Sequence, residues 1–126
     1  MAPVHLADGE ALTRALAQPS LLLFKHSLRC PTSAWAFREY EAFVEARPEV
    51  PTGWLDVVAQ RTLARGITSA HGIGHASPQA LWFRDGRVIW HAAHGAITTA
   101  ALDEATRPAE SPAAGAAPAA EASATA

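Results

Sequence analysis

Apolar and polar residues alternate along this chain with the spacings of helices and strands. A helical spacing of apolar residues over 8–17 predicts a short amphipathic helix with Asp8 as its N-cap residue. The unbroken apolar run over 21–25, which has a charged end, is typical of a strand covered on both faces. Residues 31–47 have the most regular helical pattern in the chain, and Pro48 follows them. The first part of the chain therefore predicts a helix, a strand and a second helix.

The rest of the sequence predicts further elements in the same way. These are a strand over 54–58, a helix over 62–71, strands over 79–83 and 88–91, and a helix over 99–105. Thr98 precedes the last helix as its N-cap residue. Asp85-Gly86 between the last two apolar runs is the strongest short signal of a hairpin, so we expect these two strands to be antiparallel. The tryptophans are expected in the core or lining a groove: Trp35, Trp54, Trp82 and Trp90.

The order of these elements predicts the fold class. A strand, a helix and a strand in succession close into a right-handed unit with parallel strands. Here that half is followed by an antiparallel hairpin and a helix, which is the layout of thioredoxin and glutaredoxin. We therefore expect an α/β protein with a thioredoxin-like fold, in which a four-stranded mixed sheet is flanked by helices.

The composition places these elements in one domain. A chain of 126 residues is long enough for one domain with a sizeable core, here expected over 1–106. Residues 107–126 are mainly alanine, proline, glutamate, serine and glycine, so we expect a disordered tail. The formal net charge is -2 and there is no basic stripe, which argues against nucleic acid as a partner. No apolar run approaches the roughly 20 residues of a membrane span, so no membrane association is expected.

We expect a cytoplasmic location. The amino terminus lacks the basic and then apolar pattern of a signal peptide. The chain has one cysteine, which excludes an internal disulfide framework and suits a reducing compartment.

That cysteine, Cys30, lies at the junction of the first predicted strand and the helix over 31–47. Pro31 is suited to the first helical position, which places Cys30 at or beside the N-cap. Unpaired backbone N–H groups and the positive end of the helix dipole stabilise a thiolate there, and Arg29 adds a full positive charge. We therefore interpret Cys30 as a nucleophile with a lowered pKa, and the alternative is a small buried apolar residue.

Pro78 stands immediately before the predicted strand over 79–83. In thioredoxin-like proteins the peptide bond before a proline at this place is cis, and its loop lies against the active cysteine. An ordinary proline at the entry to a strand is the alternative. The combination of Pro78 with Cys30 favours the thioredoxin-like interpretation.

Five segments give the sequence a more specific resemblance. They are Phe24-Lys25-His26-Ser27, Cys30-Pro31-Thr32-Ser33, His75-Ala76-Ser77-Pro78-Gln79, Asp85-Gly86-Arg87-Val88-Ile89-Trp90-His91 and His94-Gly95-Ala96-Ile97-Thr98. In their order and spacing they resemble the YtxJ-type monothiol bacilliredoxins, the thioredoxin-like proteins of the bacillithiol system. The resemblance covers residues 21–102. Two places depart from the pattern: Leu28-Arg29, where the family usually has small polar residues, and Gly95, where an aromatic residue is common.

The resemblance implies a reaction and a set of site residues. The reaction is removal of bacillithiol from S-bacillithiolated client proteins, with Cys30 as the catalytic thiol. Bacillithiol is then a co-substrate, and no cofactor is bound permanently. The residues implied for ligand binding lie around the thiol: Arg29, Pro31, Ser33, Ser77, Pro78 and His94.

Each of these residues has an expected role. Ser33 stands where a dithiol enzyme has its resolving cysteine, and it either donates a hydrogen bond to the thiolate or belongs to the capping pattern of the helix. Arg29 is suited to the malate group of bacillithiol, or is plain surface. Ser77 presents backbone groups to the ligand. By analogy with glutaredoxins, the opening of the last helix, with His94, receives a ligand carboxylate.

Other classes of function stay open as alternatives. Two pairs of histidines have spacings from which a metal site with Cys30 can be drawn: His71 with His75, and His91 with His94. Glycines interrupt the first pair and a predicted strand ends within the second, so we expect no bound metal. A non-catalytic thioredoxin-fold module and an iron–sulfur scaffold resembling monothiol glutaredoxins are the remaining alternatives. Against the scaffold, Pro31-Thr32 replaces the Gly-Phe of the Cys-Gly-Phe-Ser loop in that group.

Overall fold

The computed structural model describes residues 2–107 of the chain. Apart from Arg107, the predicted tail over 107–126 lies outside the described residues. The elements are α1 (Gly9–Leu16), β1 (Ser20–His26), α2 (Pro31–Ala46), β2 (Thr52–Asp56), α3 (Arg61–Ala70), β3 (Gln79–Arg84), β4 (Arg87–Ala93), a short 3-10 helix η1 (His94–Ala96) and α4 (Thr99–Ala105). Every predicted helix and strand is present, with ends within two residues of the prediction.

The strands form one sheet in the order β2-β1-β3-β4. β1 is parallel to β2, and β3 is antiparallel to both β1 and β4. This arrangement confirms the predicted thioredoxin-like fold. Lys25 of β1 pairs with Gln79 of β3, and Gln79 also pairs with Ala93 of β4. The end of β1 that leads to Cys30, the start of β3 and the end of β4 therefore lie together at one end of the sheet.

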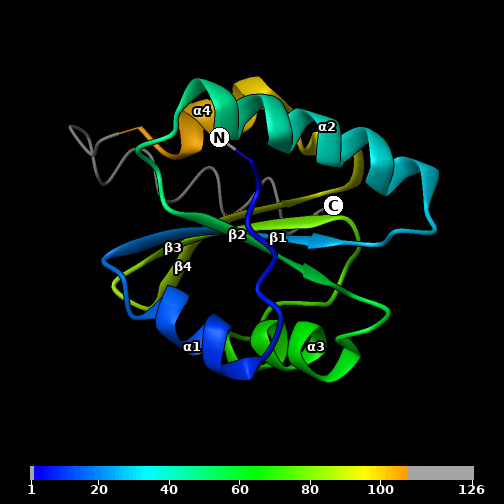
Figure 1. The fold of residues 1–126 in the computed structure, drawn as a ribbon, viewed down its shortest axis with the longest axis vertical. Coiled ribbons are helices and arrows are strands. Elements are labelled where there is room, and N and C mark those ends of the chain that lie inside the picture. Colours follow the sequence, from blue (N-terminus) through cyan, green and yellow to red (C-terminus); the bar gives the residue numbers. More distant parts are fainter. Residues whose placement is uncertain (1, 108–126) are drawn as a thin grey trace.

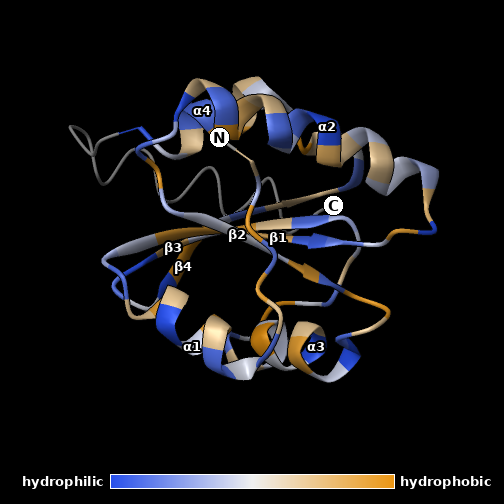
Figure 2. Cartoon of the chain, viewed as in Figure 1, coloured by the Kyte–Doolittle hydropathy of each residue, from blue (hydrophilic) through white to orange (hydrophobic). Residues whose placement is uncertain are grey.

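Helices cover both faces of the sheet. α2 and α4 lie on one face, and α1 and α3 lie on the other (Figure 1). Because successive side chains of a strand point to opposite faces, the apolar run of β1 contributes to two cores. Phe24 packs in the cluster that includes Tyr40 of α2, whereas Leu23 packs in the cluster that includes Leu12 of α1. In Figure 2 the helices carry hydrophilic residues among hydrophobic ones, as expected for amphipathic helices on a sheet.

The long helix α2 packs its predicted apolar face against the sheet. Ala36, Tyr40 and Phe43 are buried there. The sequence places Trp35 in the core or a groove, and this prediction is wrong, because Trp35 is 68% exposed. The Arg38 guanidinium lies 5.5 Å from the centre of the Trp35 ring. Trp35 directly precedes the buried Ala36, so the rotation of about 100° per residue carries it out of the buried stripe.

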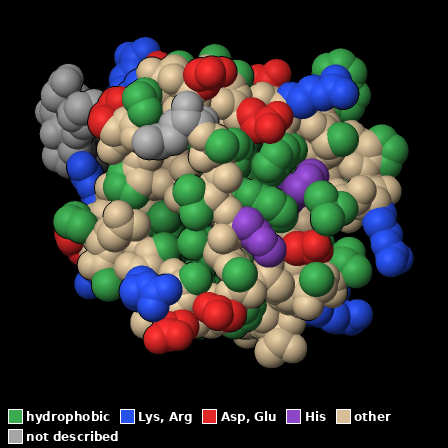
Figure 3. All heavy atoms as spheres, in the orientation of Figure 1, with side chains coloured by type: hydrophobic (Ala, Val, Ile, Leu, Met, Phe, Trp, Pro, Cys, Tyr) green, Lys and Arg blue, Asp and Glu red, His purple; other side chains and the backbone are tan. Residues whose placement is uncertain are grey.

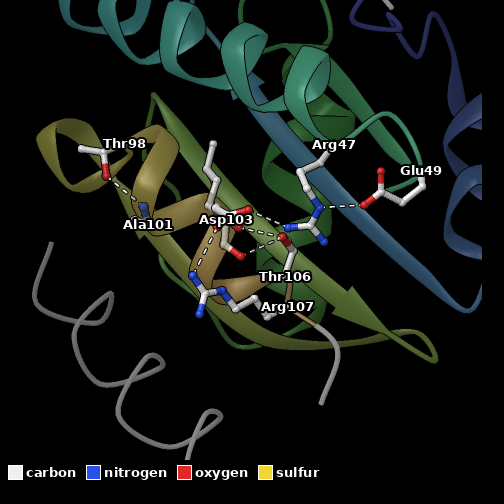
Figure 4. Close-up of polar contacts among 8 residues, drawn as sticks. Arg47, Glu49, Thr98, Ala101, Asp103, Thr106 and Arg107 are labelled. Carbon is white, nitrogen blue, oxygen red and sulfur yellow. Dashed lines mark hydrogen bonds and ion pairs between the residues drawn. The ribbon is translucent and has the colours of Figure 1, made fainter. Parts of the chain in front are cut away.

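Polar contacts at the end of α2 tie this helix to α4 (Figure 4). Arg47 lies 2.7 Å from a carboxylate oxygen of Glu49 and 2.6 Å from a carboxylate oxygen of Asp103. Arg107 lies 3.5 Å from the other oxygen of Asp103. Thr98 caps α4 as predicted, since its hydroxyl oxygen accepts a backbone hydrogen bond at 3.0 Å. The contact between Arg47 and Asp103 thus joins α4 to the end of α2 on the same face of the sheet.

β2 begins and ends two residues earlier than predicted. Its last residue, Asp56, accepts hydrogen bonds from the backbone N–H groups of Val58 and Ala59 at 2.9 and 3.0 Å. These bonds turn the chain toward α3, and Val58 is 49% exposed rather than part of a buried strand. The free edge of β2 is covered by the amino-terminal segment, dark blue in Figure 1, where the Trp54 N–H donates to the carbonyl of Val4 at 2.9 Å.

The surface of the described residues shows neither a spanning helix nor one dominant charge on the face in view. Within residues 2–107, no helix combines the length and the apolar character needed to cross a membrane. On the face drawn in Figure 3, basic and acidic side chains are interspersed around the periphery. This distribution agrees with the small formal net charge of -2.

Candidate active site

Cys30 lies where the chain leaves β1 and enters α2. It is the N-cap residue of α2, with an extended backbone (φ -108°, ψ 124°), and Pro31 is the first helical residue. The Cys30 carbonyl accepts a hydrogen bond from the Ala34 N–H at 3.0 Å, so the first helical turn closes onto it. The Cys30 side chain is half-buried. The placement predicted from the sequence, a cysteine at the start of a helix with proline after it, is present in the structure.

The first turn of α2 favours the thiolate form of Cys30. The backbone N–H of Ser33 has the largest effect and lowers the pKa of the thiol, and the backbone and hydroxyl groups of Thr32 lower it further. Partial burial raises the pKa, but the net shift is downward. The side chain closes no full capping hydrogen bond, so these groups act on the sulfur mainly through their partial charges. A cysteine in this position is suited to nucleophilic attack.

The Ser33 hydroxyl contacts residues other than Cys30. It is fully buried, lies 2.7 Å from His26 Nδ1 and accepts a hydrogen bond from the Ser27 N–H at 2.9 Å. Its own hydrogen is available to His26 Nδ1 when that ring nitrogen carries no proton. The sequence predicts a donor to the thiolate or a helix cap, and the structure shows a different contact. The Ser33 hydroxyl fastens the loop before Cys30 to α2.

Aromatic side chains hold His26 in this contact. Its ring stacks on Phe37 with the ring centres 4.3 Å apart, and it meets Trp54 edge-on at 5.6 Å. Burial lowers the pKa of His26, while the charge of Asp56 raises it, and the net shift is downward. His26 is therefore neutral near pH 7 and able to accept the hydrogen of Ser33.

The Ser77–Pro78 peptide bond is cis and lies at the entry to β3. Pro78 is buried, and its carbonyl accepts a hydrogen bond from the His94 N–H at 3.1 Å. The Ser77 hydroxyl oxygen is buried and has no hydrogen-bond partner within residues 2–107. Strand pairing thus places Ser77, Pro78 and His94 at the end of the sheet where β1 leads to Cys30.

The start of α4 is occupied by a carboxylate of the chain itself. Glu39 Oε1, from α2, accepts hydrogen bonds from the Thr99 N–H at 2.6 Å and from the Thr99 hydroxyl at 2.7 Å. These bonds lower the pKa of Glu39. The sequence predicts that this helix start, with His94, receives a ligand carboxylate, but in the structure Glu39 takes that position. The reason is that α2 and α4 share one face of the sheet and bring Glu39 to Thr99.

Leu28 and Arg29 form the exposed part of the loop before Cys30. Leu28 is 65% exposed. The Arg29 N–H donates to the Ser27 hydroxyl at 3.4 Å, while its guanidinium makes no ion pair with any other described residue. The Arg29 guanidinium is therefore exposed and unpaired within residues 2–107, and its charge is not among the effects that shift the pKa of the neighbouring Cys30.

Lys25 is a further polar residue at this end of the sheet, beyond those that the sequence predicts. Its Nζ lies 2.8 Å from His75 Nδ1 and 2.9 Å from Gln79 Oε1. Burial lowers its pKa to about 7, and the charge of Arg65 lowers it to a smaller extent. The available signal in the sequence is a lysine at the end of an apolar run that is covered on both faces.

His71 and His75, the first pair considered for a metal site, make other contacts. His71 Nδ1 lies 2.9 Å from the carbonyl oxygen of Ile67, and His75 is hydrogen-bonded to Lys25. Within the part of the chain that the structure describes, no three His, Cys, Asp or Glu side chains are grouped closely enough to hold a metal ion.

Solved structures share this architecture. A thioredoxin-fold protein proposed to be an oxidoreductase is 27% identical, with a TM-score of 0.76, and the match covers 82% of this chain and 92% of that one. Mitochondrial thioredoxin 3 of Saccharomyces cerevisiae is 16% identical, with a TM-score of 0.65 and 81% and 91% covered. Thioredoxin of Fasciola hepatica is 19% identical, with a TM-score of 0.64 and 80% and 93% covered. The last two likenesses concern the fold alone.

The sequence also matches one family over most of its length. The profile of the family described as monothiol bacilliredoxin BrxC matches residues 5–102, which include Cys30, Ser33 and the Ser77–Pro78 bond. The resemblance to monothiol bacilliredoxins is thereby confirmed. The chain belongs to the monothiol bacilliredoxin BrxC family and is a thiol-redox protein with a thioredoxin-like fold.

Proposed function

We propose that this protein removes bacillithiol from S-bacillithiolated client proteins by thiol–disulfide exchange at Cys30. The observation that carries the proposal is a single thiol at the start of α2, with its pKa lowered by backbone N–H groups, in a member of the monothiol bacilliredoxin family. Thiolates of this kind attack disulfides near neutral pH. Bacillithiol acts as a co-substrate, and the proposal involves no permanently bound cofactor.

The exchange proceeds in two balanced steps. First, the Cys30 thiolate attacks the bacillithiol sulfur of the client mixed disulfide. A disulfide forms between Cys30 and bacillithiol, and the client cysteine leaves as a thiolate that takes a proton from water. In the second step another thiol, such as free bacillithiol, attacks the bacillithiol sulfur of the adduct, and Cys30 leaves as a thiolate. The client is reduced, and the second thiol is oxidised to a disulfide with bacillithiol.

Only a monothiol route is open to this chain. Cys30 is its single cysteine, so no internal thiol resolves the adduct. Ser33 stands at the position of a resolving cysteine, and its hydroxyl is bonded to His26 and Ser27 instead. The second thiol must come from solution, which suits a reducing compartment that we propose to be the cytoplasm.

Groups near Cys30 support binding of a small acidic thiol. The exposed guanidinium of Arg29 is suited to a carboxylate of the malate group. Ser77 presents its backbone groups to the ligand, next to the cis bond, because its hydroxyl oxygen is buried. Pro78 and His94 hold this wall of the site together through their backbone hydrogen bond. Arg29 thus takes the place of the start of α4 as the proposed site for a ligand carboxylate.

Intact-protein mass spectrometry tests the proposal by following the bacillithiol group. A client with one S-bacillithiolated cysteine is mixed with the wild-type protein and, in a separate reaction, with Cys30→Ser. We expect the wild-type protein to gain the mass of one bacillithiol as the client loses it, and to lose that mass when free bacillithiol is added. We expect no transfer to Cys30→Ser. The transfer rate should fall as the pH falls through the lowered pKa of Cys30, because the thiol replaces the thiolate.

A matched pair of arginine variants tests the binding role. Arg29→Gln removes the exposed cation that precedes Cys30 in the chain, and Arg14→Gln removes one from α1, where the guanidinium pairs with Glu10 at the surface. We expect slower transfer in Arg29→Gln alone, with alkylation of Cys30 by uncharged iodoacetamide unchanged in both. A wild-type protein that iodoacetamide alkylates readily but that takes up no bacillithiol would contradict the proposed function.

A further inference from the structure

Lys25 is the only lysine of the chain, and its side chain is 0% exposed. It lies in β1, the strand that leads to Cys30. Its Nζ lies 2.8 Å from His75 Nδ1 and 2.9 Å from Gln79 Oε1. Burying an amine is costly because the ammonium form loses its hydration, whereas an apolar side chain of similar volume fills a core at no such cost. The retained amine therefore indicates a specific contact.

The contacts of Lys25 converge on the segment over 74–79, which contains the cis bond and is called the cis-proline segment below. Gln79 Oε1, which accepts from Lys25, also accepts from the Ala76 N–H at 3.3 Å. Gln79 Nε2 donates to the carbonyl of Gly74 at 3.1 Å. One amine of β1 is thus connected to the beginning, the middle and the end of this segment.

The groups around the Lys25 amine are a side-chain amide, an imidazole and the arginines of α3. Its hydrogen-bond partners within residues 2–107 include no carboxylate, and the charges that act on Lys25 and His75 from α3 are those of Arg61 and Arg65. Burial, and to a smaller extent the charge of Arg65, lowers the pKa of Lys25 to about 7. A neutral amine has two hydrogens, which suffice for His75 and Gln79. The geometry is therefore suited to a neutral donor.

The next residue of β1 makes the corresponding contact on the opposite face. Successive side chains in a strand point to opposite faces of the sheet. His26 binds the Ser33 hydroxyl at 2.7 Å and so anchors the loop before Cys30, while Lys25 anchors the cis-proline segment. Two adjacent residues of one strand thus fix the two backbone segments at this end of the sheet.

We propose that Lys25 is a positioning residue for thiol exchange, which holds the cis-proline segment through His75 and Gln79 so that Ser77 meets the ligand. Lys25 does not touch the reacting sulfur atoms. Its effect on exchange rests on the proposed function, whereas its effect on the segment does not. Loss of the amine weakens ligand binding and leaves the reactivity of the free Cys30 thiol intact, because the groups that favour the thiolate belong to α2.

Lys25→Met is the first test, because methionine keeps the apolar stem and removes the amine. Leu23→Met, on the same face of β1, is the matched control. In Lys25→Met we expect amide hydrogen exchange at Ala76 to be roughly tenfold faster than in the wild type, as for the loss of one or two hydrogen bonds. The exchange at Tyr40, in the core, should keep its wild-type rate. We expect KM for a bacillithiolated client to rise roughly tenfold, with kcat unchanged within about twofold. The rate of alkylation by iodoacetamide should equal that of the wild-type protein.

Gln79→Glu is the second test, since a carboxylate keeps both bonds that Oε1 accepts and gives the amine a counter-ion, while only the bond from Nε2 to the Gly74 carbonyl is lost. In protein labelled with 15N-lysine, the single Nζ signal should titrate at higher pH than in the wild type, and the exchange at Ala76 should stay slow. The proposal is overturned if Lys25→Met leaves the exchange at Ala76 and KM unchanged. It is also overturned if Lys25→Met slows the alkylation of Cys30 as much as it lowers kcat/KM. A wild-type protein that transfers no bacillithiol, with faster exchange at Ala76 in Lys25→Met, would refute the proposed function and support the fixing of the segment.

Discussion

The buried amine of Lys25 makes the stability of this protein depend on pH in a predictable direction. Burial, assisted by Arg65, lowers the pKa of Lys25 to about 7 in the folded protein, compared with 10.5 for the ordinary side chain. Between these values the unfolded chain binds a proton that the folded protein does not bind. The free energy of unfolding therefore rises with pH across this window. The cost of burial is fully present below pH 7 and disappears above pH 10.5.

The size of this effect follows from the same two pKa values. The difference between 10.5 and about 7 corresponds to about 5 kcal/mol, at about 1.4 kcal/mol for each pKa unit. Between pH 6 and pH 9.5 this cost of burial falls by about 3 kcal/mol. It does not fall to zero, because the unfolded lysine is still largely protonated at pH 9.5. This is a substantial part of the stability of an ordinary small domain, about 5–15 kcal/mol.

Urea unfolding at several pH values between 6 and 9.5 measures the effect. Wild-type protein is compared with Lys25→Met, because Cys30 titrates in both proteins and cancels from the difference. The range stops below pH 10 because of Tyr40. Burial raises the pKa of Tyr40, so above pH 10 this tyrosine ionises in the unfolded chain before it does in the folded protein, and the stability falls. We expect the wild type to gain about 3 kcal/mol relative to the variant across this range. Parallel stability curves for the two proteins would refute the reasoning.

Three substitutions around the site have equally definite expectations. Thr32→Val removes the hydroxyl that helps to lower the pKa of Cys30, so ultraviolet titration of the thiolate should show a higher pKa and alkylation near pH 6 should be a few-fold slower. Ser33→Ala leaves the Ser27 N–H without its acceptor and should cost about 1–3 kcal/mol in the free energy of unfolding by urea. Glu39→Ala removes the carboxylate at the start of α4 and should cost about 1 kcal/mol in the same assay, by analogy with the loss of a helix cap.

Each of these expectations has an outcome that contradicts it. An unchanged Cys30 titration in Thr32→Val would mean that the backbone alone favours the thiolate. A Ser33→Ala protein as stable as the wild type would show that water replaces the buried hydroxyl without cost. For Glu39→Ala, Glu41→Ala on the exposed side of α2 is the control, and equal stability of the two variants would contradict the role assigned to Glu39.

Most of the fold follows from signals that are close together in the sequence. Asp8 and Thr98 cap their helices as predicted, because a cap depends on a side chain and the backbone three residues later. Asp85 and Gly86 make the hairpin turn with φ values of 50° and 78°, a left-handed conformation that these residue types favour. The ends of β2 differ from the prediction because the side chain of Asp56 competes for backbone N–H groups, and hydrophobicity does not report this competition.

In the candidate site, too, the features that depend on neighbouring residues are predicted and those that depend on distant residues are not. The placement of Cys30 at the start of α2 depends on its neighbours and on Pro31, so the sequence predicts it. The contacts of Lys25 with His75 and of Glu39 with Thr99 join residues far apart in the chain. Such contacts depend on which strands pair and on which face each helix packs, and residue spacing carries no information about them.

By itself, then, the sequence determined the order of the elements, the fold class, the single thiol and the family resemblance, because each depends on local pattern or on residue identity. Only the tertiary structure decided that Ser33 binds His26 rather than the thiolate, that Glu39 occupies the start of α4, and that a lysine is buried beside the cis bond. The physical reason is that buried polar groups must find partners, and the folded arrangement alone determines which partners are within reach.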